Sequence, residues 1–312
     1  MENETLPNTL QNEKAVGIEV TASTLRAVLL ENRVSIVRRF EVSLGAGESL
    51  VPRLSATIAE LREETGAEIF GVAISGLVNR LTNRVILSVQ MPELESIDLA
   101  TELKGQTGVP VQLENDANAA AYGEFILGAG RGSNSLFYAT IGNGIGGSII
   151  LDGNIWRGAN GFAGEFGHIA INEDGVKLEE VASAANIIRR THERLFHDST
   201  SSLSSRLPQN AGTIADIVAA AKDGDDFAQM MLERTGAYIG TAIASVINLL
   251  NVERVVLGGE VMGFERVILD SITRKARERS FSPSFEATRI VAAQLGTDAA
   301  AIGAALLAGQ KS

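Results

Sequence analysis

A run of glycines between two apolar segments is the part of this sequence with the clearest chemical meaning. It reads Thr140-Ile-Gly-Asn-Gly-Ile-Gly-Gly147, and the segments 135–141 and 147–151 have the composition of strands. Glycines let the backbone turn sharply and bring N–H groups close to phosphate oxygens. The alternative is a glycine-rich β-turn that binds nothing. A dinucleotide-binding fingerprint is not predicted, because that motif needs a helix directly after its loop.

Asp116 stands where an apolar segment ends and an alanine-rich segment begins. The pattern predicts a short buried strand at 109–113 and a helix at 117–127. A carboxylate at the tip of a strand can act as a general base. The alternative is that Asp116 or Asn115 only caps the helix.

Two further stretches carry polar groups or glycines where a ligand could bind. Glu165 and His168 lie in the glycine-rich segment 157–168, and a carboxylate beside an imidazole suits a ligand with several hydroxyl groups. An irregular loop with a satisfied histidine is the alternative. Gly258 and Gly259 follow a predicted strand, at the end of the strand where open α/β sheets bind ligands, although turns often carry glycine there too.

The elements that must position these residues alternate between strands and helices, which predicts an α/β fold. The order of elements is similar in the two halves of the chain, so we expect two related lobes. The predicted strands are 15–20, 24–30, 34–42, 69–74, 109–113, 135–141, 147–151, 254–257 and 289–293. The predicted helices are 49–65, 99–107, 117–127, 181–196, 213–221, 227–250, 265–277 and 297–308.

Composition limits the classes of function. With 45% apolar and 21% charged residues, the chain is that of a globular protein. A net charge of −11 argues against nucleic acid as a partner, because that affinity depends on clustered Lys and Arg. The absence of cysteine excludes disulfides and thiolate metal sites. Neither a signal peptide nor a membrane-spanning stretch is expected, so we predict a cytoplasmic protein without a membrane partner.

Taken in order, these motifs resemble those of the ROK family (repressors, open reading frames and sugar kinases). The resemblance covers about residues 14–308 and implies a two-lobed, actin-like (ribonuclease H-like) fold, with ATP and a sugar in a central cleft between the lobes, and a homodimer. We expect a disordered tail at 1–14, an N-terminal lobe at 15–116 joined by the helix at 297–309, and a C-terminal lobe at 117–296. The resemblance is strongest in 114–118, 142–147, 157–160, 164–168, 256–259 and 296–299.

The resemblance also implies roles for individual residues. Asp116 matches the catalytic base, and Asn115, Glu165, His168 and Glu179 match residues that bind the sugar. The second phosphate loop corresponds to Gly142, Gly144, Gly146 and Gly147, and the adenosine side corresponds to Gly258 and Gly259. The implied cofactors are ATP and Mg²⁺.

Three features depart from the family pattern. The first phosphate motif, Asp-x-Gly-Gly-Thr, is replaced by Glu19-Val-Thr-Ala-Ser23, so both glycines have gained side chains and the acidic residue that would position the metal is one methylene longer. The cysteine-rich zinc loop is replaced by 169–177, which contains no cysteine. The sugar loop, which in the family reads Pro-Gly after a small-residue strand and later Asn before Leu-Pro, is here Ser-Gly-Leu-Val at 75–78 and Gln-Met-Pro at 90–92, and this difference can change which sugar is bound. Separately, residues 1–14 are too few for the DNA-binding domain of repressor members, so no direct DNA-binding role is expected.

We therefore expect an ATP-dependent kinase that phosphorylates a hydroxyl group of a hexose or amino sugar. The alternative is a catalytically weak or inactive sugar-binding protein or sensor that has lost the first phosphate loop. Segment 19–23 is the part of the sequence that separates the two readings.

We predict that the purified protein contains no stoichiometric zinc and that a chelator leaves its melting temperature unchanged. The reason is that His168 has no thiolate partners, and that His192 and His197 belong to a separate predicted helical region. Elemental analysis that finds about one zinc per chain would contradict this prediction.

Overall fold

The computed structural model describes the chain except residues 1–12, 33, 46, 196–200, 208–211 and 311–312. Its contacts divide the chain into two compact units. Unit 1 consists of Met1–Arg131, Ile155–Ala163 and Leu295–Ser312, and unit 2 consists of Gly132–Asn154 and Gly164–Gln294. The division expected from the sequence ended the first lobe at residue 116, whereas the contacts extend unit 1 to Arg131 and add segment 155–163. The expected tail, 1–14, lies almost entirely outside the described residues.

Unit 1 is built on a sheet with the strand order β3-β2-β1-β4-β7. β1 pairs antiparallel with β2 and parallel with β4, and β7 extends the sheet in parallel beyond β4. The strands are β1 (Lys14–Val20), β2 (Thr24–Glu31), β3 (Ser35–Ser43), β4 (Ile69–Ile74) and β7 (Val111–Asn115), and a separate hairpin is formed by β5 (Leu77–Asn79) and β6 (Arg84–Leu87).

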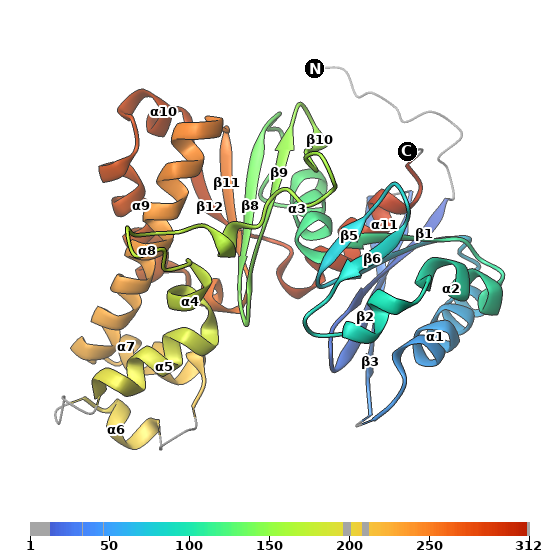
Figure 1. The fold of residues 1–312 in the computed structure, drawn as a ribbon, viewed down its shortest axis with the longest axis horizontal. Coiled ribbons are helices and arrows are strands. Elements are labelled where there is room, and N and C mark those ends of the chain that lie inside the picture. Colours follow the sequence, from blue (N-terminus) through green and yellow to red (C-terminus); the bar gives the residue numbers. More distant parts are fainter. Residues whose placement is uncertain (1–12, 33, 46, 196–200, 208–211, 311–312) are drawn as a thin grey trace. The chain divides into compact units, whose positions relative to one another are not determined.

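Helices cover both faces of this sheet (Figure 1). Alternation along β1 sends Val16, Ile18 and Val20 into the core shared with α1 (Leu50–Thr65) and α2 (Leu99–Thr107). Ala15, on the opposite face, packs in a second core with α11 (Ala299–Ala308). Helix α3 (Asp116–Leu127) packs against α11, which explains why it belongs to unit 1. Short 3₁₀ turns lie at Pro92–Ser96 and Gly296–Asp298.

Unit 2 contains the other sheet, in the order β10-β9-β8-β11-β12. β8 and β9 form an antiparallel hairpin, and β11 runs parallel to both β8 and β12. The strands are β8 (Leu136–Ile141), β9 (Ile145–Leu151), β10 (Asn154–Ile155), β11 (Arg254–Gly258) and β12 (Arg289–Ala292). The helices are α4 (Glu179–Ala182), α5 (Ala184–Leu195), α6 (Leu203–Arg206), α7 (Ile214–Lys222), α8 (Asp226–Leu250), α9 (Glu265–Arg279) and α10 (Ser282–Ala287), with 3₁₀ turns η3 (Phe166–His168) and η4 (Glu260–Phe264).

The predicted α/β class is confirmed, and one predicted helix is wrong in detail. The helix expected at 181–196 is two helices, α4 and α5, separated by Ser183 in an extended conformation. The break turns the N–H of Ala184 toward the carbonyl oxygen of Gly142, 2.8 Å away. A contact distant in the sequence therefore overrides the local helical pattern. Within the described residues, no helix combines the length and the apolar character needed to cross a membrane.

Helix α11 approaches its neighbours more closely than side chains would allow, because glycines lie at the contacts. A Cβ atom on Gly303 would lie 1.7 Å from the carbonyl oxygen of Ala119 in α3. On the sheet side, a Cβ atom on Gly17 would lie 1.8 Å from the carbonyl oxygen of Ala301. Both neighbours are backbone atoms of regular elements, which cannot move aside without breaking the packing.

We predict that Gly303→Ala lowers the free energy of unfolding by about 3 kcal/mol, because the methyl group forces α3 and α11 apart. Gly105→Ala is the matched control, since Gly105 is also in a helix but a Cβ atom there meets no other group within 4 Å. The control should be stabilising by roughly 0.5–1 kcal/mol, the ordinary gain of alanine over glycine in a helix. Urea titration followed by circular dichroism measures both, and equal effects would contradict the packing argument.

Candidate active site

The glycine run forms the turn of the β8–β9 hairpin in unit 2. The last strand pair is Ile141 with Ile145, so the turn itself is Gly142-Asn143-Gly144. The N–H of Gly142 donates to the carbonyl oxygen of Gly144 at 3.0 Å. A Cβ atom on Gly142 would meet nothing closer than 4.0 Å, and Gly144 is exposed. The turn therefore has open space beside its backbone, which a phosphate group requires.

Three other glycines of the predicted phosphate and adenosine segments, Gly147, Gly258 and Gly259, have a packing role. A Cβ atom on Gly147 would lie 2.7 Å from the carbonyl oxygen of Gly164. Gly259 has φ +91°, and a Cβ atom there would lie 2.4 Å from the carbonyl oxygen of Ile141. Because β11 and β8 are parallel, the turn that contains Gly258 and Gly259 lies next to the end of β8. The structure thus brings the two glycine segments together, and Gly146 pairs with Thr140 in the hairpin ladder.

The three residues predicted to bind the sugar in unit 2 gather near the same hairpin. Glu165 directly precedes η3 and His168 is its last residue, and both are exposed. The pKa of Glu165 is raised overall. Loss of solvent is the main cause, the neighbouring His168 lowers the pKa, and the charge of Glu179 raises it. Glu179 begins α4, and its Oε2 atom accepts the N–H of Ile145 at 2.7 Å. Carboxylates and an imidazole at such short range can bind the hydroxyl groups of a polyol.

Asn115 and Asp116 lie in unit 1, at the end of β7 and the start of α3. The cap of α3 is Asn115, whose Oδ1 accepts the N–H of Asn118 at 2.9 Å. The Oδ1 atom of Asp116 accepts the N–H of Ala117 at 2.8 Å and the side-chain amide of Asn115 at 3.1 Å. Asn115 is therefore the N-cap, and Asp116 adds an acceptor for a second N–H in the first turn of α3.

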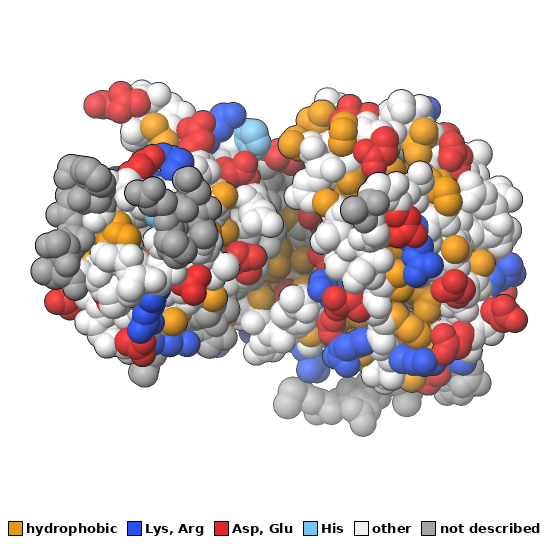
Figure 2. Space-filling model, turned by 90° about the horizontal axis from the view of Figure 1, so that it is seen from below, with side chains coloured by type: hydrophobic (Ala, Val, Ile, Leu, Met, Phe, Trp, Pro, Cys, Tyr) orange, Lys and Arg blue, Asp and Glu red, His pale blue; other side chains and the backbone are white. Residues whose placement is uncertain are grey.

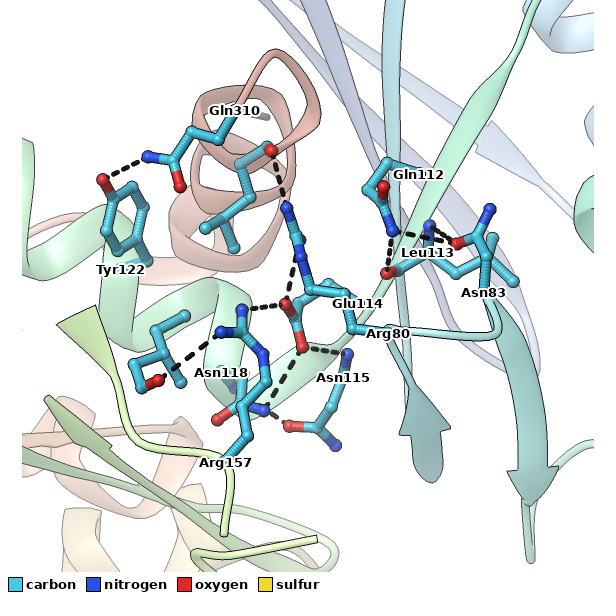
Figure 3. Close-up of polar contacts among 12 residues, drawn as sticks. Arg80, Asn83, Gln112, Leu113, Glu114, Asn115, Asn118, Tyr122, Arg157 and Gln310 are labelled. Atoms are coloured by element: carbon cyan, nitrogen blue, oxygen red, sulfur yellow. Dashed lines mark hydrogen bonds and ion pairs between the residues drawn. The ribbon is translucent and has the colours of Figure 1, made fainter. Parts of the chain in front are cut away.

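A buried carboxylate that the sequence analysis missed lies directly before this pair (Figure 3). The side chain of Glu114 is 2% exposed, and its Oε2 lies 3.1 Å from Arg80 and 2.6 Å from Arg157. Its Oε1 accepts the side-chain amide of Asn118 at 3.3 Å. Arg80 also donates to the carbonyl oxygen of Leu307 at 3.0 Å. The one sequence signal for this cluster is the presence of an acidic residue, Glu114, inside an apolar strand pattern. The two arginines give no local signal, because they lie 34 and 43 positions away in the sequence.

The Glu114 cluster attaches three segments of unit 1 to the end of β7. Arg80 comes from the β5–β6 hairpin and Arg157 from segment 155–163, whereas Leu307 belongs to α11. Burial lowers the pKa of Arg80, and the facing Glu114 raises it. The side chain of Asn83, in the turn of the hairpin, accepts the N–H of Leu113 at 2.8 Å and so pairs with the outer edge of β7. The strand that carries Asn115 and Asp116 is therefore fixed on both sides.

The altered first phosphate motif forms the turn between β1 and β2. The hydroxyl of Thr21 accepts the N–H of Thr24 at 3.0 Å and makes a hydrogen bond of 2.8 Å with the hydroxyl of Thr24. A side chain thus closes this turn where the family pattern has glycine. Ala22 and Ser23 form its exposed tip.

Glu19, the residue predicted to position a metal, is held by Arg26 on the neighbouring strand at 2.9 Å. The pKa of Glu19 is raised to about 7: burial raises it most, the neighbouring Arg26 lowers it, and Asp116 and Asp298 raise it. Within the described ranges, no three His, Cys, Asp or Glu side chains converge to hold a metal ion. On the face shown in Figure 2, basic side chains are interspersed with acidic ones.

Comparisons with known proteins agree on one family. The sequence model of the ROK family matches residues 15–311. The glucokinase of Thermotoga maritima is 30% identical over 306 residues, which cover 94% of this chain and 96% of the relative. A solved ROK family glucokinase from Streptomyces griseus, in complex with glucose and AMPPNP, has a TM-score of 0.83 at 27% identity and covers 96% of this chain and 100% of that one.

Similarity extends to regulators as well. The structure of a ROK family transcriptional regulator, a homologue of the E. coli MLC protein, has a TM-score of 0.84 at 27% identity. The alignment covers 95% of this chain and 77% of the regulator. The regulator is therefore the longer protein.

We predict that Glu114→Ala lowers the free energy of unfolding by about 3–5 kcal/mol, because two largely buried guanidinium groups lose their carboxylate. The matched control is Glu68→Ala. Glu68 also pairs with an arginine, Arg62, at 3.0 Å, but its side chain is 66% exposed, so the loss should stay below about 1 kcal/mol. Thermal and urea unfolding measure both variants. Similar losses in the two would show that burial of Glu114 has no special weight.

Proposed function

The chain belongs to the ROK family, and we propose that it is an ATP-dependent kinase that phosphorylates a hydroxyl group of a hexose or amino sugar. The observation that carries the proposal is the division of labour at the end of β7. Asn115 is the N-cap of α3, and the side-chain amide of Asn115 and the N–H of Ala117 together orient the carboxylate of Asp116 at the strand tip, as a general base requires. The glucokinase relatives support the reaction type.

The proposed mechanism assigns a role to each group of residues within its own unit. In unit 1, Asp116 accepts the proton of the attacking hydroxyl, and the side-chain amide of Asn115 holds the carboxylate in place. In unit 2, the groups that can bind sugar hydroxyls are Glu165, His168 and Glu179, and the turn 142–144 can bind phosphates through backbone N–H groups. Phosphoryl transfer depends mainly on such positioning and on neutralisation of charge.

Open space beside Gly142 and the exposure of Gly144 fit a nucleotide phosphate, because a side chain at position 142 would occupy the approach. Magnesium usually keeps several waters and binds through the phosphates with one or two carboxylates, so the protein needs no complete cage for it. When bound, Mg²⁺ neutralises charge on the β- and γ-phosphates. A role for Glu19 in positioning it stays a prediction, as do the homodimer and the cytoplasmic location.

The sensor remains the second candidate because of one observation, the closed β1–β2 turn. Thr21 uses its hydroxyl to bind the N–H of Thr24, and that N–H is therefore not available to a phosphate. The kinase is favoured because the predicted base and the open glycine turn are both present. A panel of hexoses and N-acylated amino sugars, assayed for sugar-dependent ADP release, separates the two candidates.

We predict that Asp116→Asn lowers kcat by about two to four orders of magnitude without changing the melting temperature, because the amide keeps the shape of the carboxylate but cannot accept the proton. Asp98→Asn is the matched control. Asp98 also lies at a helix start in unit 1, where it accepts the N–H of Thr101 at 3.2 Å, and it has no proposed role in the reaction. A folded Asp116→Asn variant with nearly unchanged kcat would exclude Asp116 as the base.

We predict that the triple change Glu19→Asp, Thr21→Gly and Ala22→Gly raises a low kcat of the wild type. Removing the Thr21 hydroxyl frees the N–H of Thr24, and glycines let the turn approach the γ-phosphoryl oxygens, where charge develops. The change is measured by ADP release with the best sugar of the panel. If neither protein phosphorylates any sugar, the kinase proposal is to be abandoned in favour of the sensor.

A further inference from the structure

Glu179 contacts two segments that the proposed function treats as separate sites. Its Oε2 atom accepts the N–H of Ile145, the first residue after the glycine turn, at 2.7 Å. The same oxygen lies 3.1 Å from the position of a Cβ atom on Gly144 and 3.3 Å from that of a Cβ atom on Gly167. Gly144 belongs to the turn proposed to bind phosphates, and Gly167 lies between Glu165 and His168. The carboxylate therefore lies beside both segments.

A second hydrogen bond from the same region holds the other side of the glycine turn. The N–H of Ala184, directly after the break between α4 and α5, donates to the carbonyl oxygen of Gly142 at 2.8 Å. The residues before and after the tip of the turn are thus both bound to the α4–α5 region. Because three residues with two glycines have much conformational freedom, these two bonds restrict the shape of the turn, together with the bond from the N–H of Gly142 to the carbonyl oxygen of Gly144 inside it.

The segment that carries Glu165 and His168 also packs on the hairpin through backbone. A Cβ atom on Gly167 would lie 2.4 Å from the carbonyl oxygen of Ile145, and one on Gly164 would lie 2.4 Å from that of Gly147. Glycines at both positions let the two chains approach to backbone contact. A shift of either segment must therefore move the other.

We propose that Glu179 is a positioning residue that couples sugar binding to nucleotide binding, an inference that rests on the proposed function. Its Oε2 atom fixes the glycine turn, and among the described residues none donates to Oε1, which can accept a hydroxyl of the sugar. A sugar bound at Oε1 holds the carboxylate in one rotamer and so holds the turn in its phosphate-binding shape. The entropy of ordering the turn is then lost once, with the first ligand, and the second ligand binds more tightly.

If Glu179 only bound sugar, a different result would be expected, because its loss would leave the affinity for the nucleotide unchanged when no sugar is present. The test therefore measures binding of AMPPNP with Mg²⁺ to the full chain by calorimetry in the absence of sugar. The variants are Glu179→Ala, which removes the acceptor for Ile145, and Glu179→Gln, which keeps an acceptor oxygen but removes the charge. Glu180→Ala is the matched control, because the exposed Glu180 lies in the same helical turn and accepts the N–H of Lys177 at 3.0 Å.

We expect Kd for AMPPNP to rise about tenfold in Glu179→Ala, to stay within about threefold in Glu179→Gln and to be unchanged in Glu180→Ala. A folded Glu179→Ala protein with wild-type Kd would overturn the inference. The sugar that the wild type phosphorylates fastest is then added at saturation. It should lower Kd for AMPPNP in the wild type but not in Glu179→Gln, and an equal decrease in both would also overturn the inference.

The second measurement decides the question even if Glu179→Ala fails to fold. Failure of the proposed function gives a different result from failure of the inference. If the proposed function is wrong, the wild type binds no AMPPNP and phosphorylates no sugar. If the wild type binds AMPPNP and phosphorylates a sugar, and the variants bind AMPPNP as the wild type does, the kinase proposal stands and only the coupling is excluded.

Discussion

A buried carboxylate must be surrounded by hydrogen-bond donors, and one buried carboxylate of unit 1 is that of Glu114. Burial of its charge would be prohibitive without Arg80 and Arg157, which approach the same oxygen from different segments of the chain. Satisfying one side chain thus fixes the β5–β6 hairpin, segment 155–163 and the end of β7 together (Figure 3). Asn115 and Asp116 directly follow Glu114, so the buried ion cluster also fixes the position of the proposed base.

Unit 2 fixes its proposed ligand groups by another means, which is backbone contact at glycines. Gly147 with Gly164, and Gly167 with Ile145, bring two chain segments closer than any side chain would permit. Such contacts have no rotamers and little freedom to adjust, so they suit groups that must be held within a fraction of an ångström. Glu179 then adds one directional bond to an otherwise steric arrangement.

Most of the fold could be predicted from the sequence because its strands and long helices follow simple periodicities. β1, β4 and β11 are apolar runs between clear turn signals, and α1 shows buried Leu54, Ile58 and Leu61 at helical spacing. The break at Ser183 could not be predicted, since a hydrogen bond to a turn 40 residues earlier causes it. The short β5–β6 hairpin was missed for the same reason, because it is held by contacts with β7 and by few residues of its own.

The candidate site could be predicted where a role depends on residues close together in the sequence. It could not be predicted where a role depends on contacts between residues that are distant in the sequence. The motif around Asp116 suggested either a cap or a base, and the geometry assigned the cap to Asn115. The glycine run suggested one role for all its members, whereas the structure separates the open Gly142 from Gly144, which lies beside Glu179, and from the tightly packed Gly147. The arginines that hold Glu114 carry no local signal, since an arginine on a loop is ordinarily a solvated side chain.

The division of the chain into units has a consequence for the order in which the protein can form during synthesis. Helix α11, which covers one face of the unit 1 sheet, follows every other described element in the chain. While ribosomes translate unit 2, the sheet of unit 1 exposes the face that contains Ala15, Val28 and Leu30, and Arg80 lacks its bond to Leu307. Unit 1 therefore begins first and is completed last, and the nascent chain keeps an uncovered apolar surface through almost its whole translation.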